Sequence, residues 1–225
     1  MTVPLFEVAR ASRSSAASRF VMDFQMNTNM PTSMEEEFRL LQHELFNIIE
    51  RWSTFCDLYG KVEDVEMLNS VAPRFFRIVQ DVLVDDVILS IRRLLDRERI
   101  MGHDILSLEH LIKHLSPTRH SSLHAEVLTL YEKIQRDSKQ LKKIRDSILA
   151  HNNLKKKKSQ SVNLYTNVSR KVIDGQIESL CSLMNKIHGA LNDTETDYAS
   201  AGNLPDGALM LLEQLRGMEK KKCAV

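Results

Sequence analysis

Apolar residues recur every three or four positions along most of the chain, and this spacing restricts the fold more than any other feature of the sequence. One face of an α-helix repeats at this interval, whereas a half-buried strand alternates apolar and polar residues. The 225 residues include only 7 glycines and 5 prolines, too few turn residues for a sandwich or barrel of many short strands. We therefore predict an all-α fold, a bundle of four to five helices.

The same spacing indicates where the helices lie. A capping box at Ser33–Glu36 predicts the start of the first helix and Gly60 its end. Pro73 suits the first turn of the second helix, and Asp104 or Ser107 could cap a short third one. We expect helices over residues 33–60, 73–97, 108–115, 119–150 and 169–191, with a helical turn or two over 62–68 and a last amphipathic helix over 205–218.

These elements suggest three regions. Residues 1–33 carry arginines among serines and alanines, a composition typical of a transit peptide, but a disordered leader or a misassigned start codon explains it better. Residues 34–191 hold the helical bundle. Residues 192–225 are expected to form a polar linker and the C-terminal amphipathic helix.

Composition also restricts the setting in which the protein works. No apolar run reaches the length of a membrane span, because Asp85 and Asp86 interrupt the best candidate, Val82–Leu89. The three cysteines are odd in number and widely spaced, which fits a reducing compartment. We expect a soluble, cytoplasmic protein without a cofactor.

A basic block lies inside an otherwise acidic chain. Residues 133–171 contain twelve Lys or Arg and two acids, so they carry +10, and the rest of the chain carries −9. Such a block is an electrostatic footprint for polyanions. The side chains expected to contact RNA phosphates are Lys142, Lys143, Lys155, Lys156, Lys157 and Lys158. The alternative for the four consecutive lysines is an ordinary solvated loop.

Arg145, Asp146 and His151 are the candidate catalytic residues. Arginine offers a permanently charged planar fork for a phosphate, and histidine can exchange a proton near neutral pH. Together they could cleave RNA without a metal ion. On an ideal helix, side chains six residues apart point about 120° away from each other and lie about 9 Å apart along the axis. One copy would therefore bring both groups together only if the helix loosens after Ala150, and otherwise a second subunit must complete the site. The alternative is a histidine favoured by the helix dipole, with Arg145 paired to Asp137 or Asp146.

Several segments occur in the order found in the abortive-infection, AbiU-like branch of the HEPN superfamily, which the chain resembles over about residues 35–190. They are Leu68-Asn69, Phe75-Phe76, Val82–Leu89, Arg93-Leu94-Leu95-Asp96, Leu106-Ser107-Leu108 and Ile144-Arg145-Asp146-Ser147-Ile148-Leu149-Ala150-His151.

The resemblance implies a dimeric helical bundle. Many members are metal-independent endoribonucleases in which the Arg and His of two subunits line one cleft, and the polar residue after the arginine, here Asp146, orients the pair. Other members are non-catalytic modules that bind RNA or a partner protein. The chain departs from the pattern at Asn152-Asn153, where a basic residue and an acid are expected, and at Arg97, where proline is expected.

Three further polar residues are candidates for lining the cleft: Arg93, Asp96 and Asn152. Arg93 and Asp96 are three apart, so the alternative is a structural ion pair on one helix face. Four histidines form two i,i+4 pairs, His110/His114 and His120/His124, a spacing that can bind zinc. We expect them to face solvent and predict no metal site.

The sequence leaves three hypotheses for function. The first is a metal-independent endoribonuclease of HEPN type in a defence or toxin-like role, a homodimer acting on RNA and regulated by an antitoxin or another protein. The second is a non-catalytic module of the same fold that binds RNA or a partner protein. The third is a bundle that binds a nucleotide or another small ligand. Whether the protein is an enzyme stays open at this point.

Overall fold

The computed structural model describes residues 30, 32–115, 120–146, 168–203 and 207–223, and they form the predicted all-α bundle. The helices are α3 (Thr32–Tyr59), α4 (Val62–Val71), α5 (Pro73–Leu94), α6 (Leu108–His114), α7 (Ser121–Asp137), α8 (Lys139–Ile144), α10 (Arg170–Asn192) and α11 (Ala208–Cys223), with a 3-10 turn, η3 (Tyr198–Gly202). Residues 1–29 of the expected leader lie outside the described residues. Among the described helices none is long and apolar enough to cross a membrane.

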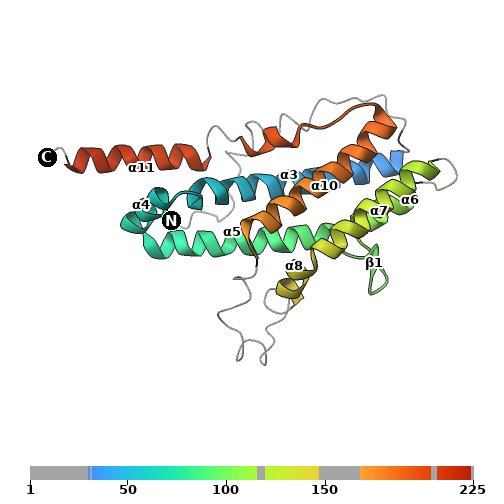
Figure 1. The fold of residues 1–225 in the computed structure, drawn as a ribbon, viewed down its shortest axis with the longest axis horizontal. Helices are drawn as coiled ribbons and strands as arrows, with labels where there is room; N and C mark the ends of the chain where they lie inside the picture. Colours follow the sequence, from blue (N-terminus) through green and yellow to red (C-terminus); the bar gives the residue numbers. More distant parts are fainter. Residues whose placement is uncertain (1–29, 31, 116–119, 147–167, 204–206, 224–225) are drawn as a thin grey trace, which may run out of the picture.

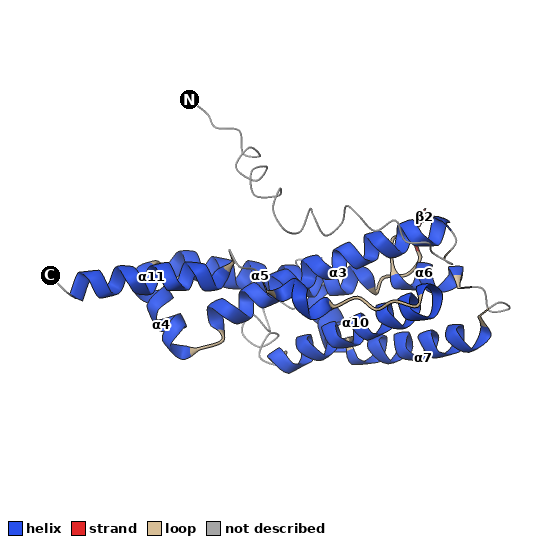
Figure 2. Ribbon diagram, turned by 90° about the horizontal axis from the view of Figure 1, so that it is seen from above, coloured by secondary structure: helices blue, strands red, loops and turns tan. Residues whose placement is uncertain are grey.

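One large core lies between α3, α5, α7 and α10, the long helices that run along the bundle in Figures 1 and 2. Each helix contributes an apolar stripe at helical spacing, as the sequence predicts. The fully buried side chains of the core include Leu41, Leu45, Ile48, Ile88, Ile91, Ile134, Leu180 and Ile187. All four stripes therefore meet in one apolar cluster.

A short hairpin and a capped helix follow α5. Strands β1 (Arg99–Ile100) and β2 (His103–Asp104) pair antiparallel, and positive φ angles at Met101 and Gly102 make the tight turn between them. Helix α6 then begins behind Ser107, whose hydroxyl accepts a hydrogen bond from the His110 backbone N–H at 3.3 Å. Of the two predicted caps, Ser107 is the one used.

Ser138 interrupts the helix that the sequence predicts to be continuous from 119 to 150. Helix α7 ends at Asp137 and α8 begins at Lys139. The Ser138 hydroxyl donates to the Gln135 carbonyl at 3.0 Å, a local bond that competes with the helical ladder and bends helices. The apolar stripe continues on both sides of the break, with Ile134, Leu141 and Ile144 all buried, so apolar spacing alone did not indicate it.

The stretch 192–203, expected to be a polar linker, packs on the bundle instead. Tyr198 in η3 is 5% exposed, and this burial raises the pKa of its phenol to about 12. The backbone of Thr196 exchanges two hydrogen bonds with the Asn185 side chain, at 2.9 and 3.0 Å. The Thr196 hydroxyl accepts a third from Gln42 Nε2 at 2.9 Å. The polar groups of Thr196 are therefore bonded by side chains of α3 and α10.

Helix α11 docks on its own bundle, an arrangement that the sequence left open. A second, smaller apolar cluster joins α11 to α4 and to the adjoining ends of α3 and α5. Leu212 is fully buried in it, and the Arg216 side chain forms an ion pair with the buried Asp64. The opposite face of α11 remains exposed at Leu209, Met210 and Met218.

Candidate nucleic-acid interface and catalytic site

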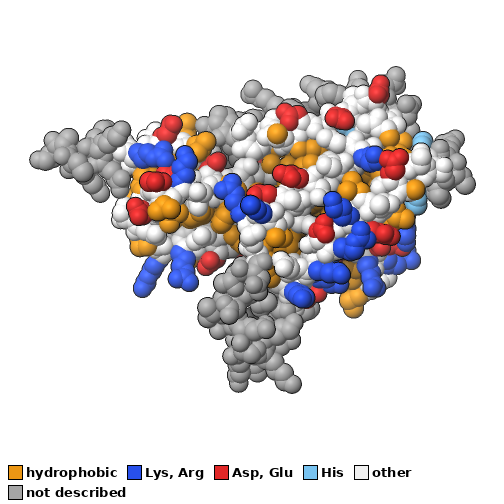
Figure 3. Space-filling view, viewed as in Figure 1, with side chains coloured by type: hydrophobic (Ala, Val, Ile, Leu, Met, Phe, Trp, Pro, Cys, Tyr) orange, Lys and Arg blue, Asp and Glu red, His pale blue; other side chains and the backbone are white. Residues whose placement is uncertain are grey.

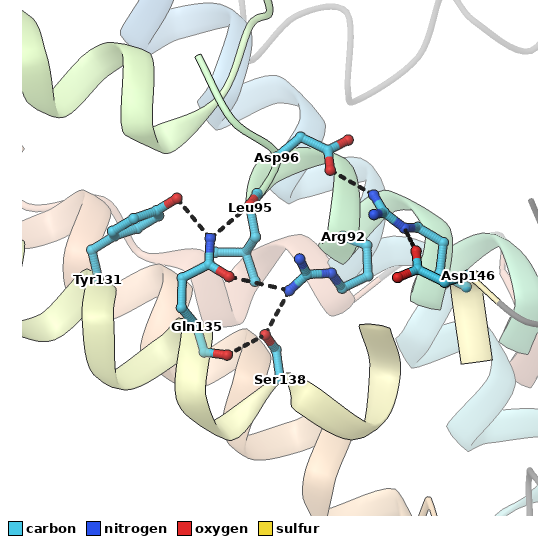
Figure 4. Close-up of polar contacts among 8 residues, drawn as sticks. Arg92, Leu95, Asp96, Tyr131, Gln135, Ser138 and Asp146 are labelled. Carbon is cyan, nitrogen blue, oxygen red and sulfur yellow. Dashed lines mark hydrogen bonds and ion pairs between the residues drawn. The ribbon is translucent and has the colours of Figure 1, made fainter. Parts of the chain in front are cut away.

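Arg145 lies at the C-terminal end of α8, where the helix loosens into a wider turn. Its Nη1 lies 2.5 Å from Asp96 Oδ1, just beyond the end of α5, and its Nε donates to Asp146 Oδ1 at 2.9 Å. Figure 4 shows the two carboxylates on either side of the guanidinium. The Arg145 and Asp96 side chains are about one fifth exposed, at 21% and 19%, and Asp146 is 44% exposed. Two carboxylates thus fix the guanidinium at the surface.

A largely buried polar network connects the start of α8 to α5. Arg92 on α5 is 3% exposed, and its Nη1 donates to Ser138 Oγ at 2.6 Å. Gln135 Nε2 bonds the Leu95 carbonyl and the Tyr131 hydroxyl, each at 2.7 Å. These contacts, drawn in Figure 4, connect the α7–α8 break to the last turn of α5.

Arg93 was a sequence candidate for lining the cleft, whereas Arg92 was not. Arg92 lies four positions after Ile88 and three before Leu95, both buried, so the helical period places it on the inward face. Arg93 is exposed, and Asp96 pairs with Arg145 rather than with Arg93. The expected Arg93–Asp96 ion pair is therefore replaced by one that crosses between two helices.

Charge within the cluster keeps Arg145 cationic. Burial opposes its charge, but the hydrogen bonds that Arg145 donates to Asp96 and Asp146, together with the negative charges of these carboxylates, outweigh that effect and raise the pKa of Arg145. Burial, and then the positive charge of Arg145, lower the pKa of Arg92. A guanidinium has five N–H donors, and the two carboxylates occupy only two of those of Arg145. The remaining donors suit a phosphate group.

The surface around Arg145 is strongly basic. Lys142 and Lys143, both predicted to contact RNA, are exposed on α8. Lys139 at the start of α8 and Arg136 in the last turn of α7 are exposed as well. Figure 3 shows Lys and Arg side chains gathered over the region of α7, α8 and the β1–β2 hairpin. We call the exposed residues Arg136, Lys139, Lys142 and Lys143 the basic face.

Six of the predicted site residues lie outside the described residues: His151, Asn152, Lys155, Lys156, Lys157 and Lys158. The structure places Arg145 against Asp146, one of the two acids that the sequence offered as its ion-pair partner, and also against Asp96, a contact that the sequence did not predict. The placement of the histidine relative to Arg145 stays a prediction.

A cavity of about 710 Å³ lies elsewhere, between α3, α10 and the segment leading to α11. Three of its polar lining residues pair with one another: Trp52 Nε1 donates to Asp174 Oδ1 at 2.6 Å, and Arg170 lies 3.8 Å from the same carboxylate group. None of the residues around Arg145 lines it.

The comparisons with known proteins decide the family. The family model described as AbiU2, a HEPN family, matches residues 32–206. The chain belongs to the AbiU2 family. The matched segment runs from the start of α3 to just before α11 and includes the whole Arg145 cluster. Neither a curated protein nor a solved structure matches the chain.

Membership makes this AbiU2 protein a HEPN-type module of an abortive-infection family, as the resemblance implied. Arg145 and Asp146 follow the six-residue helix α8, whereas the sequence placed them near the end of one long bundle helix. The 192–203 stretch also falls inside the matched segment, which agrees with its packing on α3 and α10.

Proposed function

We propose that this AbiU2 protein is a metal-independent endoribonuclease with a defence or toxin-like role. The observation that supports this proposal best is Arg145, a surface guanidinium fixed between two carboxylates beside the basic face. An arginine held in this way needs little reorganisation to receive a phosphate, and preorganised charge is the largest contribution to many enzyme rates.

Cleavage would use the ribose 2′-hydroxyl as nucleophile. Its oxygen bonds to the adjacent phosphorus while the bond from phosphorus to the 5′ oxygen breaks, and His151 moves the proton as general base or general acid. Arg145 stabilises the extra negative charge that develops on the phosphate. Asp146 orients Arg145 through the 2.9 Å hydrogen bond. The products would end in a 2′,3′-cyclic phosphate and a 5′-hydroxyl, and DNA, which lacks the nucleophile, would stay intact.

The direct test incubates labelled RNA and labelled DNA of the same sequence with the purified protein in EDTA. RNA cleavage with cyclic-phosphate ends and intact DNA supports the proposal. Cleavage that stops in EDTA, or that cuts DNA equally, would contradict it.

We further propose that the protein works as a homodimer, in which Arg145 and His151 of two subunits would line one cleft, as the HEPN resemblance implies. An exposed apolar stripe on α5 provides a surface for this association: Phe75, Ile78 and Val82 are 60%, 62% and 58% exposed at helical spacing. Exposed apolar stripes of this kind mark interaction sites, and in a two-fold dimer the same stripe would meet its own copy.

Light scattering should therefore give twice the chain mass at micromolar concentration, and Ile78→Glu should give a monomer because it buries a charge in the contact. Met101→Glu is the matched control: Met101 is 95% exposed in the β1–β2 hairpin and should leave the dimer intact. A wild-type monomer, or equal effects of both variants, would contradict the proposed interface.

RNA affinity should fall steeply with salt, because the basic segment displaces counterions from the phosphates. Replacing Lys155, Lys156, Lys157 and Lys158 with glutamine should reduce the slope of log affinity against log salt by up to about 3 units, if all four contact phosphates. Filter binding or fluorescence anisotropy at several salt concentrations measures this slope. An unchanged slope would show that the four lysines are solvated and that RNA binds elsewhere.

A second function is supported by the same contacts. Asp96 and Asp146 neutralise Arg145 in the described state, and Asn152-Asn153 depart from the HEPN pattern. A non-catalytic module that binds RNA or a partner protein would tolerate both features. Salt-dependent RNA binding with no cleavage of any RNA tested would favour it over the endoribonuclease.

A further inference from the structure

The contact between α3 and α6 brings together one carboxylate and two imidazoles. Glu37 lies one turn from the start of α3, and His110 and His114 are four apart on α6, so both histidines face the same side of that short helix. His110 Nε2 lies 3.3 Å from Glu37 Oε1, and His114 Nδ1 lies 2.9 Å from Glu37 Oε2. The ligand atoms of the three residues all lie within 4.8 Å of one another. We call Glu37, His110 and His114 the α3–α6 cluster.

The cluster leaves one polar atom unsatisfied. Glu37 Oε2 is buried and has no hydrogen-bond partner among the described residues, although His114 Nδ1 is close to it. The imidazole nitrogen therefore approaches the oxygen without the direction of a hydrogen bond. A buried carboxylate oxygen without a partner is costly, and a cation between the oxygen and the nitrogens would satisfy it.

The spacing fits a small tetrahedral cation. Zinc binds histidine nitrogen and carboxylate oxygen at about 2.0–2.2 Å, so two ligand atoms at a tetrahedral angle lie about 3.3–3.6 Å apart. The two imidazole nitrogens lie 3.3 and 2.9 Å from different oxygens of the Glu37 carboxylate. One ligand atom from each of the three residues lies within 4.8 Å of the other two, so small movements of the side chains would bring all three to this separation. Mg²⁺ and Ca²⁺ prefer oxygen ligands, so two imidazoles select a transition metal.

We propose that the α3–α6 cluster binds one divalent transition metal of the zinc class, held by Glu37, His110 and His114. The side chains are accessible enough for the ion to enter: Glu37 and His110 are 22% and 23% exposed, and His114 is 39% exposed. Three protein ligands leave the fourth tetrahedral position for water or an external ligand. The metal would tie α6 to the beginning of α3 at the end of the bundle where α6 is seen in Figure 1.

Contrary to the expectation that all four histidines face solvent, His110 and His114 lie against Glu37. Glu109, the neighbour of His110 in the sequence, is engaged elsewhere, because its Oε2 accepts a hydrogen bond from the Glu98 backbone N–H at 2.7 Å. The carboxylate that meets the histidines comes instead from α3, more than seventy residues earlier in the chain. The proposed site involves none of the residues proposed for RNA cleavage, so the two proposals can fail independently.

Metal binding can be measured directly on the full chain carrying no affinity tag. The protein is stripped with EDTA, dialysed and titrated with Co²⁺, whose tetrahedral complexes absorb visible light, and with Zn²⁺ by calorimetry. We expect one ion per chain, and Mg²⁺ should not compete. Because a ligand that binds only the folded state stabilises it, Zn²⁺ at about 100 times Kd should raise Tm by about 5–10 °C.

Two variants and a matched control assign the site. Glu37→Gln and His114→Ala should each weaken Co²⁺ binding by about 100-fold or more and abolish the rise in Tm. His120→Ala combined with His124→Ala removes the other i,i+4 pair, which joins no such cluster among the described residues, and should leave both readouts unchanged. If the wild type binds no more Co²⁺ than the two site variants, or if the control loses the metal equally, the proposal is wrong. Glu37→Gln keeps the size of the side chain, so it remains informative even if His114→Ala fails to fold.

Discussion

His151→Ala should slow RNA cleavage in EDTA by about 10²–10⁴-fold, the usual cost of losing a general acid or base. Arg145→Ala should cost about 10²–10³-fold, because it removes a charge that stabilises the developing phosphate charge. The Arg145 change leaves the Asp96 carboxylate, 19% exposed, without its partner. We expect the fold to survive, because the cost should stay below the ~3–5 kcal/mol of breaking a fully buried ion pair. Rates are measured with labelled RNA under single-turnover conditions, and circular dichroism verifies the fold.

Arg93→Ala is the control for this experiment. It removes the same charge from an exposed arginine on the last turn of α5 and should change the rate by less than about 10-fold, the effect of weaker electrostatic attraction alone. Asp146→Asn should have an intermediate effect, because it positions Arg145 and does not exchange a proton. If His151→Ala cleaves as fast as the wild type, the proposed catalytic role of His151 is wrong.

Leu212→Ala should lower the free energy of unfolding by about 2–5 kcal/mol, the cost of a cavity at a fully buried leucine. Leu212 is the α11 residue with no exposed surface, and it packs among Leu58, Leu68 and Phe76. In a protein of this size the change corresponds to a fall in Tm of roughly 4–20 °C. Urea unfolding followed by circular dichroism measures it.

Leu211→Ala provides the matched control on the same helix. Leu211 is 41% exposed, and its truncation should change the free energy of unfolding by no more than about 0.5 kcal/mol. Similar effects of the two substitutions would mean that α11 does not dock on its own bundle in solution. That outcome would return α11 to the alternatives of clasping a second subunit or another protein.

The helices and their inward faces could be predicted because apolar spacing reports directly on burial. The helix predicted over 33–60 is observed as α3, which ends at Tyr59. The helix predicted over 169–191 closely matches α10. Ser107 could be named as a cap because serine before an apolar helix has a local role. These features depend on neighbours in the sequence.

The remaining features depend on contacts between distant residues. Arg145 and Asp96 are 49 positions apart, and no local rule pairs them. Ser138 breaks a helix because its hydroxyl bonds both Gln135 and Arg92, yet serine also occurs inside helices. The 192–203 stretch was predicted to be solvated because it is polar, whereas Gln42 and Asn185 supply its hydrogen bonds.

The six-residue helix α8 has a consequence for how mutations would reach the candidate site. A helix this short is not stable alone, so the position of Arg145 depends on the buried Leu141 and Ile144 and on the contact of Ser138 with Arg92. Substitutions deep in α5 would therefore displace the guanidinium without touching it. The geometry of the site depends on the packing of the core. Loss-of-function substitutions should therefore occur in the interior of the bundle as well as on its basic face.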